Sequence, residues 1–121
     1  MITSAERRLK THRGGPELLA AIRRDRTHEG LVADLVAVNG LWLLEDEGEL
    51  LGFAICRDRV VEAVYVSSAR RRQGAARTLL GALLALEEPP LDAFALPGDR
   101  ATKSLYESLG WKARLLTMRG A

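Results

Sequence analysis

The sequence has few of the residues that mark secreted, metal-binding or membrane proteins. Its single cysteine, Cys56, excludes an internal disulfide and a cysteine-rich zinc site. The two histidines, His12 and His28, lack the spacing of metal ligands. No apolar run approaches the ~18 residues of a membrane-spanning helix, and residues 1–10 lack the apolar stretch of a signal peptide. We therefore expect no bound metal, no membrane contact and a cytoplasmic location.

The chain also carries little net charge. Eighteen Lys and Arg residues oppose sixteen Asp and Glu residues, and the resulting +2 is too small to steer the chain toward nucleic acid. A local basic surface is the alternative, and it would be formed by Arg7, Arg8, Lys10, Arg13, Arg23, Arg24 and Arg26. Acidic residues at positions 17, 25 and 29 interrupt this cluster. On these grounds we expect no nucleic-acid partner.

Apolar residues, by contrast, are plentiful. They make up 47% of the 121 residues, and charged residues make up 28%, a balance typical of globular proteins. A chain of this length can close one two-layer core. With no internal repeat and no linker-like stretch, residues 1–121 are expected to form a single domain.

Two helices are expected before the strand-rich part of the chain. The first spans residues 16–25, with Pro16 in its first turn. Thr27 can cap the second, whose apolar residues recur with helical spacing over positions 31–36 and which ends at Asn39-Gly40. Because Asn-Gly also forms hairpin turns, residues 31–38 could instead be a strand. We favour the helix.

The rest of the chain alternates strands and helices. A hairpin is expected from segments 41–44 and 50–56 around a polar tip at 45–48, and a third antiparallel strand from residues 60–66. Further strands are expected at 91–96 and, as a closing strand, at 111–119. A buried helix at 74–88 stops at Pro89-Pro90, and a last helix begins at Asp99 and ends at Gly110. This order predicts an α/β or α+β fold with helices on the faces of one sheet.

Three ordered motifs carry a family resemblance over residues 41–118. The stretch RRQGAA (71–76) follows the apolar strand that ends at Val66, the hairpin EDEGELLGFA precedes it, and the late helix ATKSLYESLGW contains a tyrosine. Together they resemble the GNAT superfamily of N-acetyltransferases. The resemblance implies a mixed, mostly antiparallel central sheet with splayed central strands, and acetyl transfer from acetyl-CoA to a primary amine of a small molecule or a protein. A non-catalytic acyl-CoA-binding or regulatory module is the alternative.

There is a physical reason why the glycine motif at residues 71–76 can bind a pyrophosphate. Backbone N–H groups in the first turn of a helix have no internal partner, and the helix dipole favours negative charge there, so a pyrophosphate satisfies both. Gly74 lets the backbone approach the phosphates, while Ala75 and Ala76 keep side chains from blocking that approach. Arg71 and Arg72, together with Arg77, can add charge-assisted contacts.

The resemblance adds further cofactor residues. Gln73 belongs to the same motif. Strand residues Val64, Tyr65 and Val66 are implied to pair through their backbone with the pantetheine arm, as an added strand would. Asp99 stands where many members have an asparagine, so it can cap the last helix but lacks the amide donor that helps hold the cofactor.

Two side chains are candidates for the chemistry. The resemblance points to Tyr106, whose phenol can protonate the departing thiolate. Alternation along the third strand places Glu62 on the same face as Val64 and Val66, and a carboxylate among apolar neighbours accepts protons more readily near neutrality, as a general base requires. Pairing of Glu62 with an arginine, a structural role, is the alternative. Because the chain is short for the family, a homodimer could complete the acceptor site.

Overall fold

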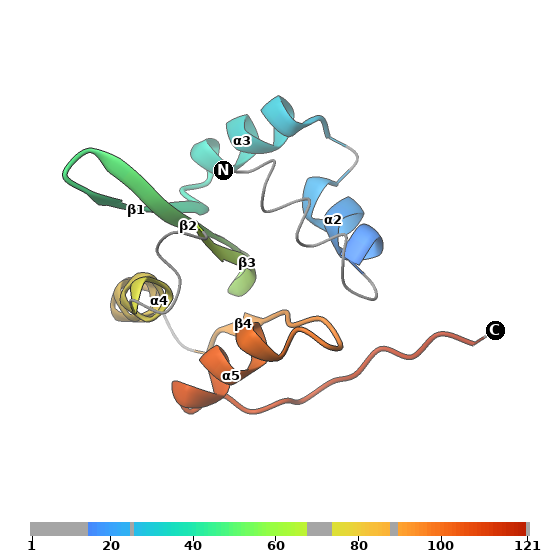
Figure 1. Ribbon diagram of the computed structural model, residues 1–121. Coiled ribbons are helices and arrows are strands. Elements are labelled where there is room, and N and C mark those ends of the chain that lie inside the picture. Colours follow the sequence, from blue (N-terminus) through green and yellow to red (C-terminus); the bar gives the residue numbers. More distant parts are fainter. Residues whose placement is uncertain (1–14, 25, 68–73, 88–89, 121) are drawn as a thin grey trace.

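A computed structural model describes residues 15–24, 26–67, 74–87 and 90–120. The elements in these ranges, in chain order, are α2 (Gly15–Arg23), α3 (His28–Ala37), β1 (Leu41–Asp46), β2 (Glu49–Arg57), β3 (Val60–Val66), α4 (Ala75–Leu86), β4 (Asp92–Ala93) and α5 (Arg100–Ser108). Figure 1 shows α2 and α3 on one side of the sheet and α4 and α5 on the other. The expected α/β architecture is confirmed.

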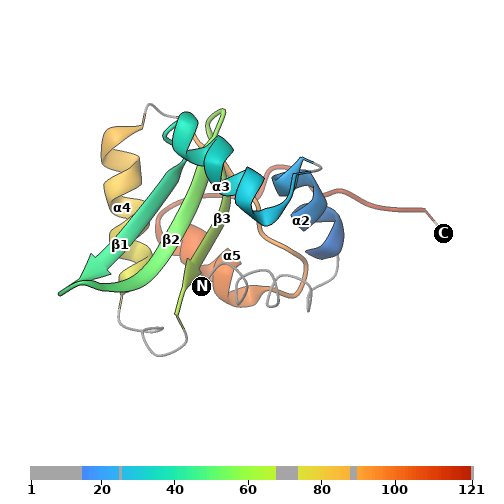
Figure 2. The same cartoon turned by 90° about the horizontal axis from the view of Figure 1, so that it is seen from above.

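The sheet has the strand order β1-β2-β3-β4. β1, β2 and β3 are antiparallel neighbours, seen side by side in Figure 2, whereas β4 runs parallel to β3. The hairpin between β1 and β2 is confirmed, but its turn is narrower than expected. Only Glu47 and Gly48 form it, with φ values of 50° and 80°. Positive φ at both central residues is the geometry of a type I′ turn, which matches the twist of the flanking strands.

Each face of the sheet carries its own core cluster. On one face, Phe53, Ile55 and Tyr65 pack against Ile22 of α2 and against Leu31 and Leu35 of α3. On the other face, the cluster consists of Ala54, Cys56, Val61, Leu79, Leu80, Leu83 and Tyr106, which come from β2, β3, α4 and α5. Successive side chains of a strand point to opposite faces, so β2 supplies both clusters by simple alternation.

The helix boundaries follow from their caps. Thr27 accepts a hydrogen bond from Gly30 N at 3.1 Å, which begins α3 and settles residues 31–37 as helix rather than strand. Asp99 Oδ1 accepts from Thr102 N at 3.3 Å and begins α5. Gly110, at φ 87°, follows the end of α5 in the left-handed conformation that glycine adopts without strain.

Two expected strands differ in the structure. The strand at 91–96 is reduced to the two residues of β4. The closing strand at 111–119 is wrong, since residues 111–120 adopt no regular structure. Trp111 still packs against the core, and only the end of the chain leads away from the body (Figures 1 and 2). A strand is stable only when a neighbour satisfies its backbone groups, and among the described residues this segment pairs with no other strand. Its apolar Leu115, Leu116 and Met118 are 68–90% exposed.

Candidate functional site

The sheet opens between β3 and β4. Their parallel ladder contains only two residue pairs and ends at Val61, opposite Ala93. Beyond Val61, the backbone N–H and C=O groups of successive β3 residues point alternately toward β2 and away from it. Ser67 N donates to Leu51 O at 2.8 Å, and Tyr65 lies opposite Phe53, so the backbone of Tyr65 faces β2. The alternation of antiparallel ladders then turns the backbone of Val64 away from β2, toward the open side.

A β-bulge at Glu62 marks the point where the ladder ends. Ile55 pairs with Ala63, but the next residue of β2, Cys56, pairs with Val61, which leaves Glu62 as the extra residue. Because of this bulge, Glu62 does not lie on the face of the strand that was expected from the sequence. Val61 and Val64 contribute to the same cluster on the α4 side, whereas a regular strand would place them on opposite faces, and Glu62 does not share a face with Val64.

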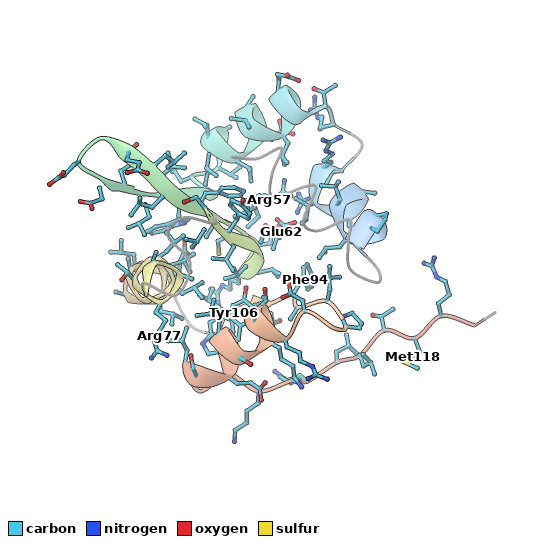
Figure 3. All side chains as sticks on the ribbon, viewed as in Figure 1. Arg57, Glu62, Arg77, Phe94, Tyr106 and Met118 are labelled. Atoms are coloured by element: carbon cyan, nitrogen blue, oxygen red, sulfur yellow. The ribbon has the colours of Figure 1, made fainter. Side chains whose placement is uncertain are left out.

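A buried ion pair holds this bulge. Arg57 and Glu62 are 8% and 7% exposed. Both Nε and Nη2 of Arg57 donate to the carboxylate of Glu62, the second at 3.0 Å, and Nη2 also donates to the carbonyl of Ile22 at 2.5 Å. Figure 3 shows the pair between the sheet and α2. The bidentate geometry uses both carboxylate oxygens, as in strong arginine–carboxylate pairs.

The beginning of α4 has the form of an anion cradle. Gly74 adopts φ 76°, and its carbonyl accepts from the backbone N of Thr78 at 3.0 Å and from its hydroxyl at 3.1 Å. A Cβ at Gly74 would meet nothing within 4 Å, so the backbone there is open to a ligand. The first helical N–H groups, from Ala75 onward, have no carbonyl four residues earlier within the helix. Residues 71–73, the other part of the motif, lie outside the described residues.

Arg77 is directed toward α5. Its Nη1 donates to Ser108 Oγ at 2.8 Å, and Ser108 Oγ donates to the carbonyl of Leu105 at 2.6 Å. Arg77 therefore ties the first turn of α4 to the end of α5, the helix that carries Tyr106. Sequence reasoning missed Ser108, because an exposed serine has no pattern of its own.

Tyr106 is enclosed in the cluster on the α4 side. Its side chain is 6% exposed, and its ring stacks on Trp111 with centroids 5.2 Å apart. Its hydroxyl is buried and has no hydrogen-bond partner among the described residues. Burial, with a smaller contribution from the Asp99 carboxylate, raises the pKa of the phenol. The phenol is thus a protonated donor with no acceptor in the described part of the chain, as is expected of a group whose hydrogen-bond partner is a bound ligand.

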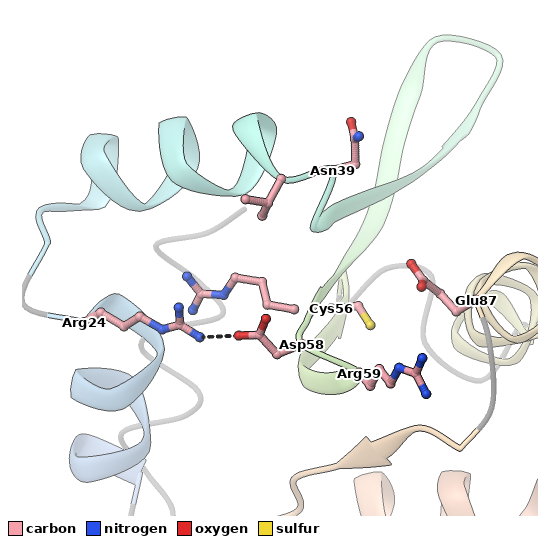
Figure 4. Close-up of a pocket in the computed structure, with 8 residues that line it drawn as sticks. Arg24, Asn39, Cys56, Asp58, Arg59 and Glu87 are labelled. Atoms are coloured by element: carbon pink, nitrogen blue, oxygen red, sulfur yellow. Dashed lines mark hydrogen bonds and ion pairs between the residues drawn. The ribbon is translucent and has the colours of Figure 1, made fainter.

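A separate cavity of about 230 Å³ lies at the other end of α4 (Figure 4). Its charged groups include Arg24 and Asp58, which form an ion pair at 3.4 Å. The lining also includes Cys56, whose thiol pKa is raised by burial and then by Glu87 and Glu62. A thiol that stays protonated is a poor nucleophile. Glu87 follows the last turn of α4, so this cavity is remote from Gly74 and does not form part of the cradle.

Among the described residues, no group of three His, Cys, Asp or Glu residues could hold a metal ion. Nor does that part of the chain contain a helix long and apolar enough to cross a membrane.

Comparison with known proteins agrees with the geometry. The model of the acetyltransferase (GNAT) domain family matches residues 37–113. Among solved structures, AAC(6')-Iy in complex with the bisubstrate analog CoA-S-monomethyl-acetylneamine is similar, with a TM-score of 0.63 at 16% identity. The match covers 87% of this chain and 88% of that one. No curated protein matches significantly in sequence.

Proposed function

Because the chain belongs to the GNAT family of acetyltransferases, it is an acetyl-CoA-dependent N-acyltransferase, and we propose that its acceptor is a primary amine of a small molecule. The similar structure AAC(6')-Iy, whose ligand joins CoA to an acetylated neamine derivative, supports a small-molecule acceptor. We also propose a cytoplasmic location, because a single cysteine fits a reducing compartment.

We infer that acetyl-CoA binds along the open side of β3 and over the first turn of α4. Gly74, Ala75 and Ala76 would offer backbone N–H groups to the pyrophosphate, and the open space at the Cβ position of Gly74 supports this. The backbone of Val64 would pair with the pantetheine arm. In the same proposal, Tyr65 and Val66 flank this contact, and Arg71, Arg72 and Gln73 supply polar groups around the phosphates. Arg77 lies in the same helical turn and would reach the phosphates only by leaving Ser108.

We assign Tyr106 the role of donating a proton or a hydrogen bond to the leaving thiolate. The acetyl-CoA thioester supplies the acetyl group and a sulfur leaving group, and the sulfur becomes an anion that needs a proton or a hydrogen bond. The phenol of Tyr106 is protonated, buried and unpartnered among the described residues. That unpartnered hydroxyl is the observation that carries the proposal, because no structural need within those residues explains it.

The sequence is compatible with two roles for Glu62, a general base or the partner of an arginine. The bidentate pair with Arg57 supports the second. We propose that Glu62 and Arg57 fix the bulge that ends the ladder between β3 and β4, and so keep the cofactor side of β3 open. Asp99 begins the helix that carries Tyr106, so its proposed contribution to the cofactor site is indirect.

Thermal unfolding with and without acetyl-CoA tests binding. Ligand at ~100 times its Kd should stabilise the fold by ~2.7 kcal/mol. A thiol-release screen over polyamines, amino acids, aminoglycosides and peptides with free N-termini then identifies the acceptor. Stabilisation without thiol release from any amine would favour the non-catalytic acyl-CoA-binding module. Absence of stabilisation would contradict the whole assignment.

A further inference from the structure

The cavity at the far end of α4 has no part in acetyl transfer. It lies where the residues that follow α2, α3 and α4 meet the turn between β2 and β3 (Figure 4). None of its lining residues belongs to the cradle at Gly74 or to the open side of β3. Its volume of about 230 Å³ is below the range of about 300–1,000 Å³ that drug-sized ligands occupy. The cavity therefore suits a smaller molecule.

The walls of this cavity are formed by three turns of the backbone. Five non-glycine residues in the described part of the chain have positive φ, and four of them line the cavity. These four are Arg24, Asn39, Asp58 and Arg59, with φ values of 51°, 54°, 52° and 63°. Such conformations are costly for residues with a side chain, and they gather at ligand sites. The turns therefore set the shape of the cavity before any ligand binds.

The charges that line the cavity balance. Arg57 is neutralised by the buried ion pair described above. The other charged residues of the lining are two cations, Arg24 and Arg59, and two anions, Asp58 and Glu87. A ligand with a single charge would be repelled by one of these two sets, whereas a ligand with one positive and one negative group finds a partner for each. The lining therefore favours a small zwitterion.

Two of these side chains have polar atoms available for a ligand. In the described part of the chain, no hydrogen bond or ion pair reaches the half-buried carboxylate of Glu87. Arg24 uses one of its five guanidinium N–H donors, on Asp58 at 3.4 Å. The side chains of that pair are 54% and 84% exposed, and such a pair contributes little to stability. Glu87 can thus accept from an ammonium group, and Arg24 can donate to a carboxylate.

The rest of the lining is less polar. Val38 and the thiol of Cys56 also face the cavity, and a protonated thiol behaves as a small apolar group. We propose that the cavity binds a free α-amino acid with an apolar side chain. Its ammonium group binds Glu87, its carboxylate binds Arg24, and its side chain lies against Val38 and Cys56. The site is independent of the identity of the acceptor amine.

Three related probes test the proposal in amide chemical-shift titrations of the full chain. They are L-leucine, 3-methylbutylamine, which is leucine without its carboxylate, and 4-methylpentanoate, which is leucine without its ammonium group. Leucine should shift the amides of Asn39, Cys56 and Asp58. Each single-charge probe should bind about tenfold more weakly, because it loses one charge-assisted contact. Equal binding of a single-charge probe, or no shift at ~20 mM leucine, would overturn the proposal.

Two variants assign each end of the ligand. Glu87→Gln should weaken leucine binding about tenfold but should bind 4-methylpentanoate no more weakly, because this probe has no ammonium group. Arg24→Met should weaken leucine binding to a similar extent but should bind 3-methylbutylamine no more weakly. Glu107→Gln, on the exposed part of α5, is the control and should bind leucine like the wild type. Leucine binding that both variants retain in full would refute the site.

CoA, which carries no acetyl group to transfer, separates this cavity from the transfer site. Leucine should bind with an unchanged Kd in saturating CoA, because the cavity and the cradle lie at opposite ends of α4. Leucine should also leave the amides of Ala75 and Ala76 unshifted. Displacement of leucine by CoA, or leucine-induced shifts at the cradle instead of around the cavity, would overturn the proposal.

Discussion

Replacing Tyr106 by phenylalanine removes one oxygen and preserves the ring. The stacking on Trp111 and the packing in the cluster on the α4 side stay, because neither depends on the hydroxyl. What the variant loses is a buried donor that has no partner among the described residues. A buried unsatisfied polar group costs about 1–3 kcal/mol. Tyr106→Phe should therefore raise the free energy of unfolding of the ligand-free protein by about 1 kcal/mol, a rise in Tm of roughly 3–6 °C for a chain of this size.

The same change should slow the reaction. Loss of a positioned proton donor costs about 10²–10⁴ in rate, so kcat of thiol release should fall within that range. The Kd of acetyl-CoA should change by less than about tenfold, because the cradle at α4 and the open side of β3 are untouched. A variant that is more stable and much slower is the signature of a functional hydroxyl in an otherwise apolar site.

Thermal unfolding without ligand, calorimetric titration with acetyl-CoA and thiol release with a fixed amine measure these three quantities. A loss of stability in Tyr106→Phe would mean that the hydroxyl has a structural partner. An unchanged kcat would mean that another group serves the thiolate. Either result refutes the assignment of Tyr106.

Other changes test the remaining parts of the site. Gly74→Ala should cost about 1–2 kcal/mol, because alanine is strained at φ 76°, and calorimetry should show a raised Kd for acetyl-CoA. Glu62→Ala should destabilise the fold by about 3–5 kcal/mol in urea unfolding by leaving a buried charge unpaired. Arg57→Met with Glu62→Leu should recover most of that loss, because no charge is then left buried without a partner. Asp99→Ala should cost about 0.5–2 kcal/mol in thermal unfolding, whereas Asp99→Asn keeps the cap. Since burial raises the pKa of Tyr106 in the folded state, wild-type stability should fall relative to Tyr106→Phe above pH ~10, where the unfolded tyrosine ionises; parallel pH profiles would contradict this.

Local features of the fold were predictable from the sequence because they depend on neighbouring residues. Thr27 and Asp99 cap their helices with side chains that reach three residues ahead. The apolar spacing of α4 predicts a buried helix, and the alternation of β2 predicts its two faces. These are short-range properties of backbone geometry and side-chain period.

Pairing between distant segments could not be predicted in the same way. The bulge at Glu62 depends on the register between β2 and β3, and it moves Glu62 to the face where Arg57 and the Ile22 carbonyl lie. Residues 111–119 have the composition of a strand, but a strand also needs a free edge beside it, which no local pattern encodes. The same limit applies to β4, which stops pairing once the bulge has turned β3.

Thiol release from acetyl-CoA in the presence of a primary amine tests the central claim most directly. Purified protein with acetyl-CoA and the amine panel should release free CoA in proportion to enzyme and amine, with a matching gain of one acetyl group in the mass of the amine. Blanks without amine should release far less. Acetyl-CoA that stabilises the fold but yields no acetylated amine with any acceptor class would contradict the assignment as an acetyltransferase.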